Sequence, residues 1–244
     1  MTKIALVTGG SGGLGEAICL KLATNGYQII FTYNSNLAAA KKVLNALAGS
    51  GHKAYSLDLS CSDDIQKLFN KINANSQRLD LLVNCAGITK FVEHSDLTGL
   101  TDDIIDNIFK VNVRAPFAMV RAFNPLLKKS KGCVINITSI AAKTAMGSNI
   151  AYCASKSAME NMTRSLARAL APDVRVLAVA PGLVDTEFVK GLDEQWRNKQ
   201  EQSTPLKRLA NSDEIAQAVF VAAEHMTFST GNTIAVDGGR PLGI

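Results

Sequence analysis

The feature that most constrains the fold of this 244-residue chain is a repeated alternation of short apolar runs with longer amphipathic segments. The apolar runs are rich in Val, Ile and Leu, which is typical of strands buried on both faces of a parallel sheet. The segments between them are long enough to be connecting helices. Seven strands are predicted, at residues 4–7, 27–32, 54–57, 81–83, 133–137, 174–179 and 233–236. We therefore expect an α/β fold, a doubly wound seven-stranded parallel sheet with helices on both faces.

One domain, residues 1–244, is predicted, because an α/β unit of this length buries a sufficient core. Two helix starts are marked by capping and acidic residues, at 62–64, beginning with Ser62, and at 211–214, beginning with Asn211. The least regular stretch, residues 182–209, follows a predicted strand and contains the only tryptophan, Trp196. We expect this stretch to be a mobile lid over a site.

Composition argues against several classes of function. The 26 basic and 21 acidic residues give a net charge of +5 without the basic block expected of a nucleic-acid or membrane partner. No segment approaches transmembrane length, and the N-terminal apolar stretch is too short for a signal peptide. The five cysteines are odd in number and lack a Cys-x-x-Cys spacing, which argues against disulfides and a metal site. A cytoplasmic location is expected.

Glycines are dense between the first predicted strand and the first helix, in Thr8-Gly9-Gly10-Ser11-Gly12-Gly13-Leu14-Gly15. Without side chains, the backbone N–H groups of such a loop can approach a phosphate, and the following helix N-terminus adds positive potential. A flexible turn is the alternative interpretation. The position at the carboxyl end of the first strand favours nucleotide binding, because doubly wound sheets bind nucleotides there.

Tyr152 and Lys156 are four residues apart in a segment with helical periodicity, so one helix face carries both. A phenol has a pKa of roughly 10, and a neighbouring ammonium stabilises the phenolate and lowers that pKa. Tyr152 is therefore a candidate proton donor. Ser139 stands just beyond a predicted strand and is a candidate donor to a substrate oxygen. Taken alone, the pair also fits an ordinary helix surface, and the serine also fits a helix cap.

Together these residues resemble the short-chain dehydrogenase/reductase family. The glycine loop matches Thr-Gly-x-x-x-Gly-x-Gly, and Asn112, Ser139, Tyr152 and Lys156 match the family's catalytic residues in order and spacing. The resemblance covers residues 3–239 and implies a Rossmann-type NAD(P)-dependent oxidoreductase. It implies that Tyr152 transfers a proton and Ser139 orients a carbonyl. It further implies that Lys156 holds the nicotinamide ribose and that Asn112 holds a water molecule.

The resemblance also implies a cofactor site without a metal. In the family, an Asp at the position of Asp58 contacts the adenine amine, and the segment at 181–186 holds the carboxamide. No Asp or Glu follows the second strand, so NADP(H) is predicted to be preferred. Use of NAD(H) as well is the alternative, because Gly12 lacks the arginine common in NADP-dependent relatives. The predicted contacts are Gly9, Ser11, Gly12, Gly13, Leu14, Gly15, Tyr33, Asn34, Ser35, Asp58, Leu59, Asn84, Ala86, Gly87, Tyr152, Lys156, Pro181, Gly182, Val184 and Thr186.

Within the family, the chain most resembles 3-oxoacyl acyl-carrier-protein reductases, acetoacetyl-CoA reductases and microbial ketoreductases. This implies ketone reduction, a thioester or other small-molecule substrate, a place in fatty acid biosynthesis, and a homotetramer or homodimer. Acyl carrier protein is a candidate partner. The basic cluster Lys128, Lys129 and Lys131 is either its docking patch or a solvated helix end. The alternatives are a sugar, polyol or steroid alcohol dehydrogenase and a non-catalytic nucleotide-sensing protein.

Overall fold

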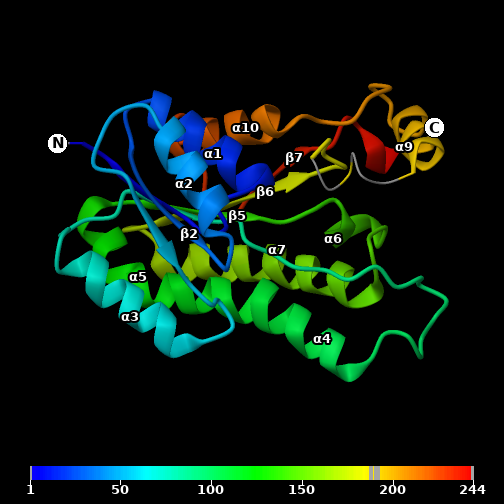
Figure 1. Ribbon diagram of the computed structural model, residues 1–244, viewed down its shortest axis with the longest axis horizontal. Helices are drawn as coiled ribbons and strands as arrows, with labels where there is room; N and C mark the ends of the chain where they lie inside the picture. Colours follow the sequence, from blue (N-terminus) through cyan, green and yellow to red (C-terminus); the bar gives the residue numbers. More distant parts are fainter. Residues whose placement is uncertain (1, 187–188, 190–192, 243–244) are drawn as a thin grey trace.

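Seven parallel strands form the central sheet of the molecule (Figure 1). The computed structural model describes residues 2–186, 189 and 193–242. The strands are β1 (Ile4–Val7), β2 (Gln28–Tyr33), β3 (Lys53–Ser56), β4 (Leu81–Asn84), β5 (Cys133–Ile137), β6 (Arg175–Pro181) and β7 (Thr233–Val236). Their order is β3-β2-β1-β4-β5-β6-β7, and each neighbouring pair is parallel. The predicted doubly wound sheet is confirmed.

The observed ends of β2, β3, β4 and β6 differ from the predicted ones by one or two residues. β2 includes Tyr33, because the Tyr33 carbonyl continues the ladder by accepting the Leu57 N–H at 2.9 Å. β6 extends to Pro181, which has no N–H but pairs with Val236 at the strand's end. Both extensions carry predicted cofactor residues to the carboxyl edge of the sheet.

Helices cover both faces of the sheet (Figure 1). One face carries α1 (Gly13–Thr24), α2 (Leu37–Ala46) and α10 (Ser212–Glu224). The other carries α3 (Ser62–Asn73), α5 (Ala115–Ser130) and α7 (Ile150–Leu170). Two separate apolar layers result, one around Phe31 and Leu22 and the other around Leu6 and Phe123. Their burial is the main stabilising contribution, at about 25 cal/mol for each Å² of apolar surface.

The remaining helices lie near the ends of strands. α4 (Asp102–Phe109) continues through a π-helical turn, η1 (Lys110–Arg114), into α5; α6 (Ala141–Thr144), α9 (Glu194–Gln202) and a 3₁₀ turn, η2 (Arg240–Leu242), complete the set of described helices. None of the helices among the described residues is long and apolar enough to cross a membrane.

The two predicted helix starts have different outcomes. At α10, Asn211 and Glu214 form a capping box in which each side chain accepts the other's N–H at 2.9 Å. At α3 the predicted Ser62 cap is wrong, because Cys61 is the N-cap residue and makes no side-chain cap bond. Ser62 is instead the first helical residue, and its Oγ accepts a hydrogen bond from Arg114 at 2.5 Å.

The strand order creates a crevice at the carboxyl edge of the sheet. From β1 the chain proceeds outward to β2 and β3, then returns past β1 to β4, so the order reverses between β1 and β4. In open parallel sheets, ligands bind at such a point. The loops after β1, β4, β5 and β6 open on this edge and carry most of the predicted site residues.

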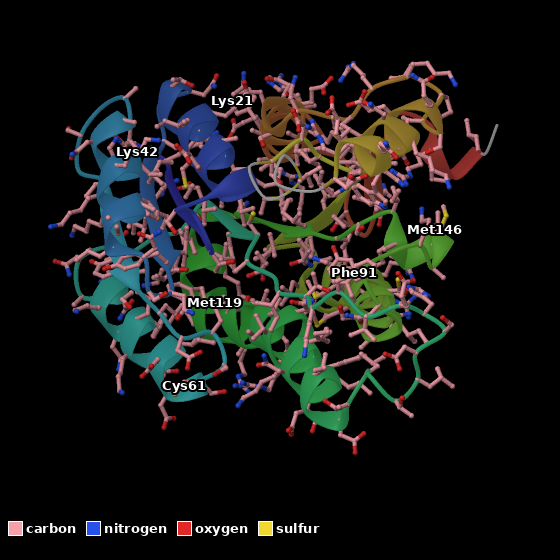
Figure 2. The ribbon with its side chains drawn as sticks, turned by 45° about the vertical axis from the view of Figure 1, so that its right-hand side comes forward. Lys21, Lys42, Cys61, Phe91, Met119 and Met146 are labelled. Carbon is pink, nitrogen blue, oxygen red and sulfur yellow. The ribbon has the colours of Figure 1, made fainter. Side chains whose placement is uncertain are left out.

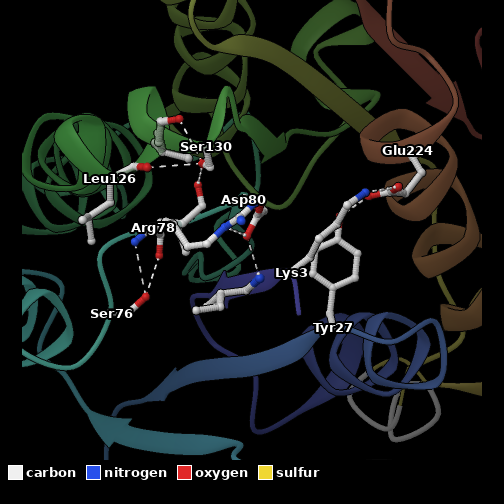
Figure 3. A network of polar contacts seen from close by, with 11 residues as sticks. Lys3, Tyr27, Ser76, Arg78, Asp80, Leu126, Ser130 and Glu224 are labelled. Carbon is white, nitrogen blue, oxygen red and sulfur yellow. Dashed lines mark hydrogen bonds and ion pairs between the residues drawn. The ribbon is translucent and has the colours of Figure 1, made fainter. Parts of the chain in front are cut away.

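The opposite, amino edge of the sheet is held by charged side chains (Figure 3). The Asp80 carboxylate pairs with Arg78 and accepts a main-chain N–H of β1 at 2.8 Å. Lys3 and Tyr27 both bind the Glu224 carboxylate at the end of α10. Burial alone would raise the pKa of Glu224, but the hydrogen bonds from Lys3 and Tyr27 lower it below its ordinary value. These contacts fix α10 against β1 and β2.

Replacing Tyr27 by Phe is expected to lower the free energy of unfolding by about 1.5–3 kcal/mol at pH 7, because a hydrogen bond to a charged carboxylate is lost. A lowered folded-state pKa means that the stabilisation is present above the ordinary Glu pKa and disappears as the pH falls through the folded value. Urea unfolding should therefore show a smaller difference from wild type below about pH 4. If Tyr27→Phe lowered the free energy of unfolding equally in a Glu224→Ala background, the loss would not come from the hydrogen bond to Glu224.

Candidate active site

The glycine loop between β1 and α1 is held tightly against β2. The Gly10 N–H donates to the Thr32 carbonyl at 2.9 Å, and the Gly9 N–H donates to Thr32 Oγ1 at 3.3 Å. A side chain at Gly15 is excluded, because a Cβ there would lie 2.1 Å from the Gly9 carbonyl oxygen. Gly13 has a φ of +51°, in the left-handed region that favours glycine. These glycines let α1 begin directly behind the loop.

The loop faces open space on the side of the crevice. A Cβ at Gly12 would meet nothing within 4 Å, and one at Gly13 would meet only the Thr186 methyl group, at 3.9 Å. The first N–H groups of a helix have no intrahelical acceptor and are suited to bind phosphate. The loop and the start of α1 therefore fit the pyrophosphate of a dinucleotide, with Ser11 in the same turn and Thr186 facing it.

A cavity of about 240 Å³ opens beside this loop at the carboxyl ends of β4, β5 and β6. It is lined by Leu14, Cys85, Gly87, Ile88, Thr89, Ile137, Thr138, Ser139, Tyr152, Lys156, Pro181, Gly182 and Val184. The predicted catalytic Ser139, Tyr152 and Lys156 thus share one cavity with predicted cofactor contacts from the other loops. A larger depression of about 630 Å³ between α1 and α10 holds none of the predicted residues. Across the described residues, no group of three or more His, Cys, Asp or Glu could hold a metal ion.

Tyr152 and Ser139 enter the cavity from α7 and from the end of β5. Ser139 Oγ accepts the Ala141 N–H at 3.1 Å, so the serine also fixes the turn into α6 and keeps its hydroxyl proton for donation. Burial raises the pKa of Tyr152 above its ordinary value, while the hydrogen bond with Ser139 acts to lower it. Two hydroxyl donors therefore lie together in one cavity, where a carbonyl oxygen can accept from both.

Lys156 forms the buried floor of the site. Its Nζ donates to the Ile137 carbonyl at 2.9 Å and lies 5.6 Å from the centre of the Tyr152 ring. Burial lowers the pKa of Lys156 to about 8. The prediction that Lys156 lowers the pKa of Tyr152 is not met, because desolvation of the phenol dominates and the ammonium is directed at the backbone.

Asn112 lies in η1 and is buried against the loop that follows β4. Its Oδ1 accepts the Ile88 N–H at 2.8 Å, and its Nδ2 donates to the Ile88 carbonyl at 2.9 Å and to Ser155 Oγ at 3.2 Å. Gly87, the preceding residue, has Asn112 Oδ1 and Lys156 Nζ 3.4 and 3.6 Å from its Cβ position. Asn112 therefore fixes this loop beside Lys156. The water predicted at Asn112 stays a prediction.

The predicted adenosine contacts lie at the ends of neighbouring strands. They are Tyr33, the last residue of β2, Asn34 and Ser35 directly after it, and Asp58 and Leu59 after β3. The preceding residue of β2, Thr32, binds the glycine loop, so this end of the sheet adjoins the phosphate site. Asp58 is exposed, and hydrogen bonds from Ser60 lower the pKa of its carboxyl group. The charged carboxylate is suited to accept a hydrogen bond from an amine.

The side chain of Asn84 is buried below the cavity. Its Nδ2 donates to Asn136 Oδ1 at 2.9 Å, and Asn136 Nδ2 donates to Thr163 Oγ1 at 2.9 Å. Asn84 therefore links β4, β5 and α7. Its predicted contact with a cofactor stays a prediction. Ala86, two residues on, does reach the glycine loop, since its N–H donates to Thr8 Oγ1 at 3.1 Å.

Sequence reasoning missed three polar residues beside Tyr152, namely Thr89, Asn149 and Ser155. Thr89 lines the cavity, and Asn149 is the N-cap residue of α7. An asparagine before an amphipathic segment is a recognisable cap signal, so the capping role of Asn149 was predictable from the sequence. The contacts of Thr89 and Ser155 join segments far apart in the chain and leave no local pattern.

The predicted lid, residues 182–209, lies partly outside the described residues, at 187–188 and 190–192. In the described part, Val184 pairs with Ala210 across a single bridge, and Arg197 of α9 pairs with Asp185 at 2.9 Å. The lid therefore includes a helix that the sequence did not indicate. Its mobility stays a prediction.

The basic cluster lies at the amino edge of the sheet. Lys128 pairs with Asp173 at 3.6 Å, and Lys129 donates to Gln77 at 3.0 Å. The cluster precedes β5, whereas Ser139 follows it, and a five-residue strand spans about 17 Å. Within one protomer the cluster therefore does not face Tyr152. Docking of a carrier protein there stays a prediction.

Comparison with known proteins identifies relatives over almost the whole chain. A family model described as enoyl-(acyl carrier protein) reductase matches residues 9–240. The 3-oxoacyl-[acyl-carrier-protein] reductase of Aquifex aeolicus is 34% identical over 245 residues, covering 97% of this chain and 96% of the relative.

Solved structures agree in fold and in length. A short-chain dehydrogenase/reductase from Serratia marcescens has a TM-score of 0.90 at 30% identity, covering 98% of this chain and 97% of that one. A Pseudomonas aeruginosa structure titled RhlG/NADP active-site complex has a TM-score of 0.88 at 29% identity, covering 98% and 96%.

The Lys156 ammonium is expected to titrate near pH 8, because its burial disfavours the charged form. Carbon-detected NMR of the lysine side chains checks this, since exposed lysines titrate near pH 10.4. The signal with the low midpoint should be absent from Lys156→Met. A midpoint above about pH 10 for Lys156 would contradict the burial of its charge.

Proposed function

The chain belongs to the short-chain dehydrogenase/reductase family of nicotinamide-dependent oxidoreductases, and from that premise we propose that it reduces a ketone to a secondary alcohol with NADPH. The substrate class we propose is a 3-oxoacyl thioester. The observation that carries the proposal is the convergence of Ser139 and Tyr152 in one cavity above the buried Lys156. That arrangement supplies two donors where a carbonyl oxygen acquires negative charge.

Each residue has a role that follows from its contacts. When bound, the nicotinamide supplies hydride to the carbonyl carbon, which places the electron pair of the carbonyl π bond on oxygen. Tyr152 donates its proton to that oxygen, and Ser139 donates a hydrogen bond to it. The Lys156 ammonium adds positive potential from below and donates to the ribose. Asn112 holds the loop that forms the opposite wall.

An acyl substituent matches the apolar side chains on two loops, of which the loop after β4 also lines the cavity through Ile88 and Thr89. Phe91 and Met146 are exposed by 69% and 54% on the loops after β4 and α6 (Figure 2). These loops are joined, since the Val92 N–H donates to the Ser148 carbonyl at 3.0 Å. A sugar or polyol would need several polar partners here, whereas the cavity lining apart from the catalytic residues is mostly apolar. This favours an acyl ketone over a sugar.

Two further proposals concern the oligomeric state of the protein and the carrier of its substrate. We propose a homodimer or homotetramer, and an acyl carrier protein or coenzyme A as the carrier of the thioester. Both follow the resemblance to acyl-carrier and acetoacetyl-CoA reductases, together with the relative from Aquifex aeolicus.

We expect the fastest turnover with acetoacetyl-CoA, followed as NADPH oxidation. The panel also contains crotonyl-CoA, assayed with NADPH, and a polyol and a steroid alcohol, both assayed with NADP⁺. Replacing Tyr152 by Phe should lower kcat roughly a thousandfold, because proton transfer is lost. The Kd for NADPH should stay within about tenfold, because Lys156 is retained. Absorbance at the reduced-nicotinamide band and fluorescence titration give these quantities.

The remaining outcomes of this panel separate the alternatives. Turnover confined to crotonyl-CoA would assign reduction of a carbon–carbon double bond, and turnover confined to the alcohols would assign a dehydrogenase. Binding of NADPH without turnover of any substrate would assign nucleotide sensing. Near-normal kcat in Tyr152→Phe would refute Tyr152 as the proton donor.

NADPH preference is proposed from the end of β2. Residues 33–36, Tyr33-Asn34-Ser35-Asn36, contain no carboxylate to accept ribose hydroxyls or repel a 2′-phosphate. Asn36 caps α2 by accepting the Ala39 N–H at 2.9 Å, so the start of that helix also faces this turn. The relative in complex with NADP supports the same preference. Lys41 and Lys42 are exposed further along α2.

Replacing Tyr33 by Asp should shift the ratio of kcat/KM for NADPH over NADH toward NADH by at least about tenfold, because the new carboxylate repels a 2′-phosphate. Tyr33→Asn is the matched control, since it changes shape without adding charge. Steady-state kinetics with each cofactor measure the ratio. A wild-type preference for NADH, or equal ratios in the two variants, would place the discriminating contacts elsewhere.

A further inference from the structure

Asn149 connects the helix that carries Tyr152 to the loop that forms the facing wall of the cavity. We propose that it is a positioning residue, which sets the place of Tyr152 through two separate sets of hydrogen bonds. The inference rests on the proposed function, because it concerns the proton donor of that same site. Asn149 is fully buried, with no exposed surface, although asparagine is mostly an exposed residue.

The first contact is with Tyr152 itself. Asn149 is the N-cap residue of α7, and its Oδ1 accepts the Tyr152 N–H at 2.7 Å. Tyr152 is the third residue of α7, so this bond acts on the backbone of the proton donor and not on a neighbour. The position of the Tyr152 side chain thus depends on the position of Asn149 Oδ1.

The second set of contacts is with the loop after β4. Asn149 Nδ2 donates to the Lys90 carbonyl at 2.6 Å and to Thr89 Oγ1 at 3.3 Å. An amide is needed for this combination, because one end accepts and the other donates. Aspartate has no donor for Lys90, and serine is too short to reach both sides. Thr89 lines the cavity, so the bond also sets the facing wall.

These contacts belong to a network of hydrogen bonds that holds the Tyr152 backbone at both its N–H and its carbonyl. The loop held by Asn149 at Thr89 and Lys90 is held one residue earlier, at Ile88, by Asn112. Asn112 Nδ2 also donates to Ser155 Oγ, and the Ser155 hydroxyl donates to the Tyr152 carbonyl at 2.7 Å. The N–H and the carbonyl of Tyr152 are thereby both tied, through buried amides, to one loop.

Asn149 makes more hydrogen bonds than a helix cap requires. Asn211 caps α10 with one bond of the same kind, to the Glu214 N–H at 2.9 Å, and lies away from the cavity on an exposed surface. Asn149 has the same cap bond and adds the two donations to the facing loop. The donations join residues 59 and 60 positions apart. These two donations therefore set the distance between Tyr152 and the facing wall of the cavity.

The test uses three variants of the full chain with whichever ketone the wild type reduces. Asn149→Ala removes the cap bond and the loop bonds, Asn149→Ser keeps a cap acceptor only, and Asn211→Ala removes a matched cap elsewhere. We expect kcat to fall about a hundredfold in Asn149→Ala and about tenfold in Asn149→Ser, because small displacements of a reacting group cost rate. KM and the Kd for NADPH should stay within about threefold. Asn211→Ala should keep wild-type kcat.

Amide exchange of Tyr152, measured by NMR, supplies a readout independent of turnover. Exchange should be faster in Asn149→Ala and close to wild type in Asn149→Ser, in which kcat is nevertheless reduced. Wild-type kcat in Asn149→Ser would reduce Asn149 to a helix cap and overturn the proposal. Equal behaviour of Asn149→Ala and Asn211→Ala would do the same. If the wild type reduces no ketone, the proposed function fails, while unchanged exchange in Asn149→Ala would refute the positioning contact separately.

Discussion

The buried ammonium of Lys156 is the constraint around which the site is arranged. A cation in the interior loses its hydration, which costs several kcal/mol unless polar groups replace the water. The Ile137 carbonyl at the end of β5 does so at 2.9 Å, and burial still lowers the pKa of Lys156 to about 8. The length of β5 and the position of α7 across it must therefore bring the Ile137 carbonyl and Lys156 together. Hydrophobic burial in the two layers offsets this cost.

Asparagine amides hold α7 to the sheet at two levels. Below the cavity, Asn84 and Asn136 link β4 and β5 to Thr163 in the middle of α7. At the cavity, Asn112 and Asn149 link the start of α7 to the loop after β4. An amide suits these places because it both donates and accepts without carrying charge, so it adds no field that would compete with Lys156. The helix is thus fixed where the candidate catalytic residues Tyr152 and Lys156 lie.

Sequence reasoning predicted what is encoded locally and missed what is encoded across the fold. The strand series and the four-residue spacing of Tyr152 and Lys156 follow from periodicity, and the structure places both residues on one helix face. The glycine loop followed from composition and position. The pairing of Asn84 with Asn136 joins residues 52 positions apart, and a single sequence carries no signal for it. The Tyr152 pKa was misjudged because proximity to Lys156 was weighed without the burial of the phenol.

That raised pKa bears on the protonation state of the candidate proton donor. A phenol with a pKa above its ordinary value is protonated at neutral pH, so the site presents a proton where an oxyanion would form. The hydrogen bond with Ser139 acts to lower the pKa of Tyr152 and so opposes part of the effect of burial. The Lys156 ammonium lies 5.6 Å from the centre of the Tyr152 ring and donates to the Ile137 carbonyl. Burial therefore shifts the pKa values of Tyr152 and Lys156 in opposite directions, each toward the neutral form of the side chain.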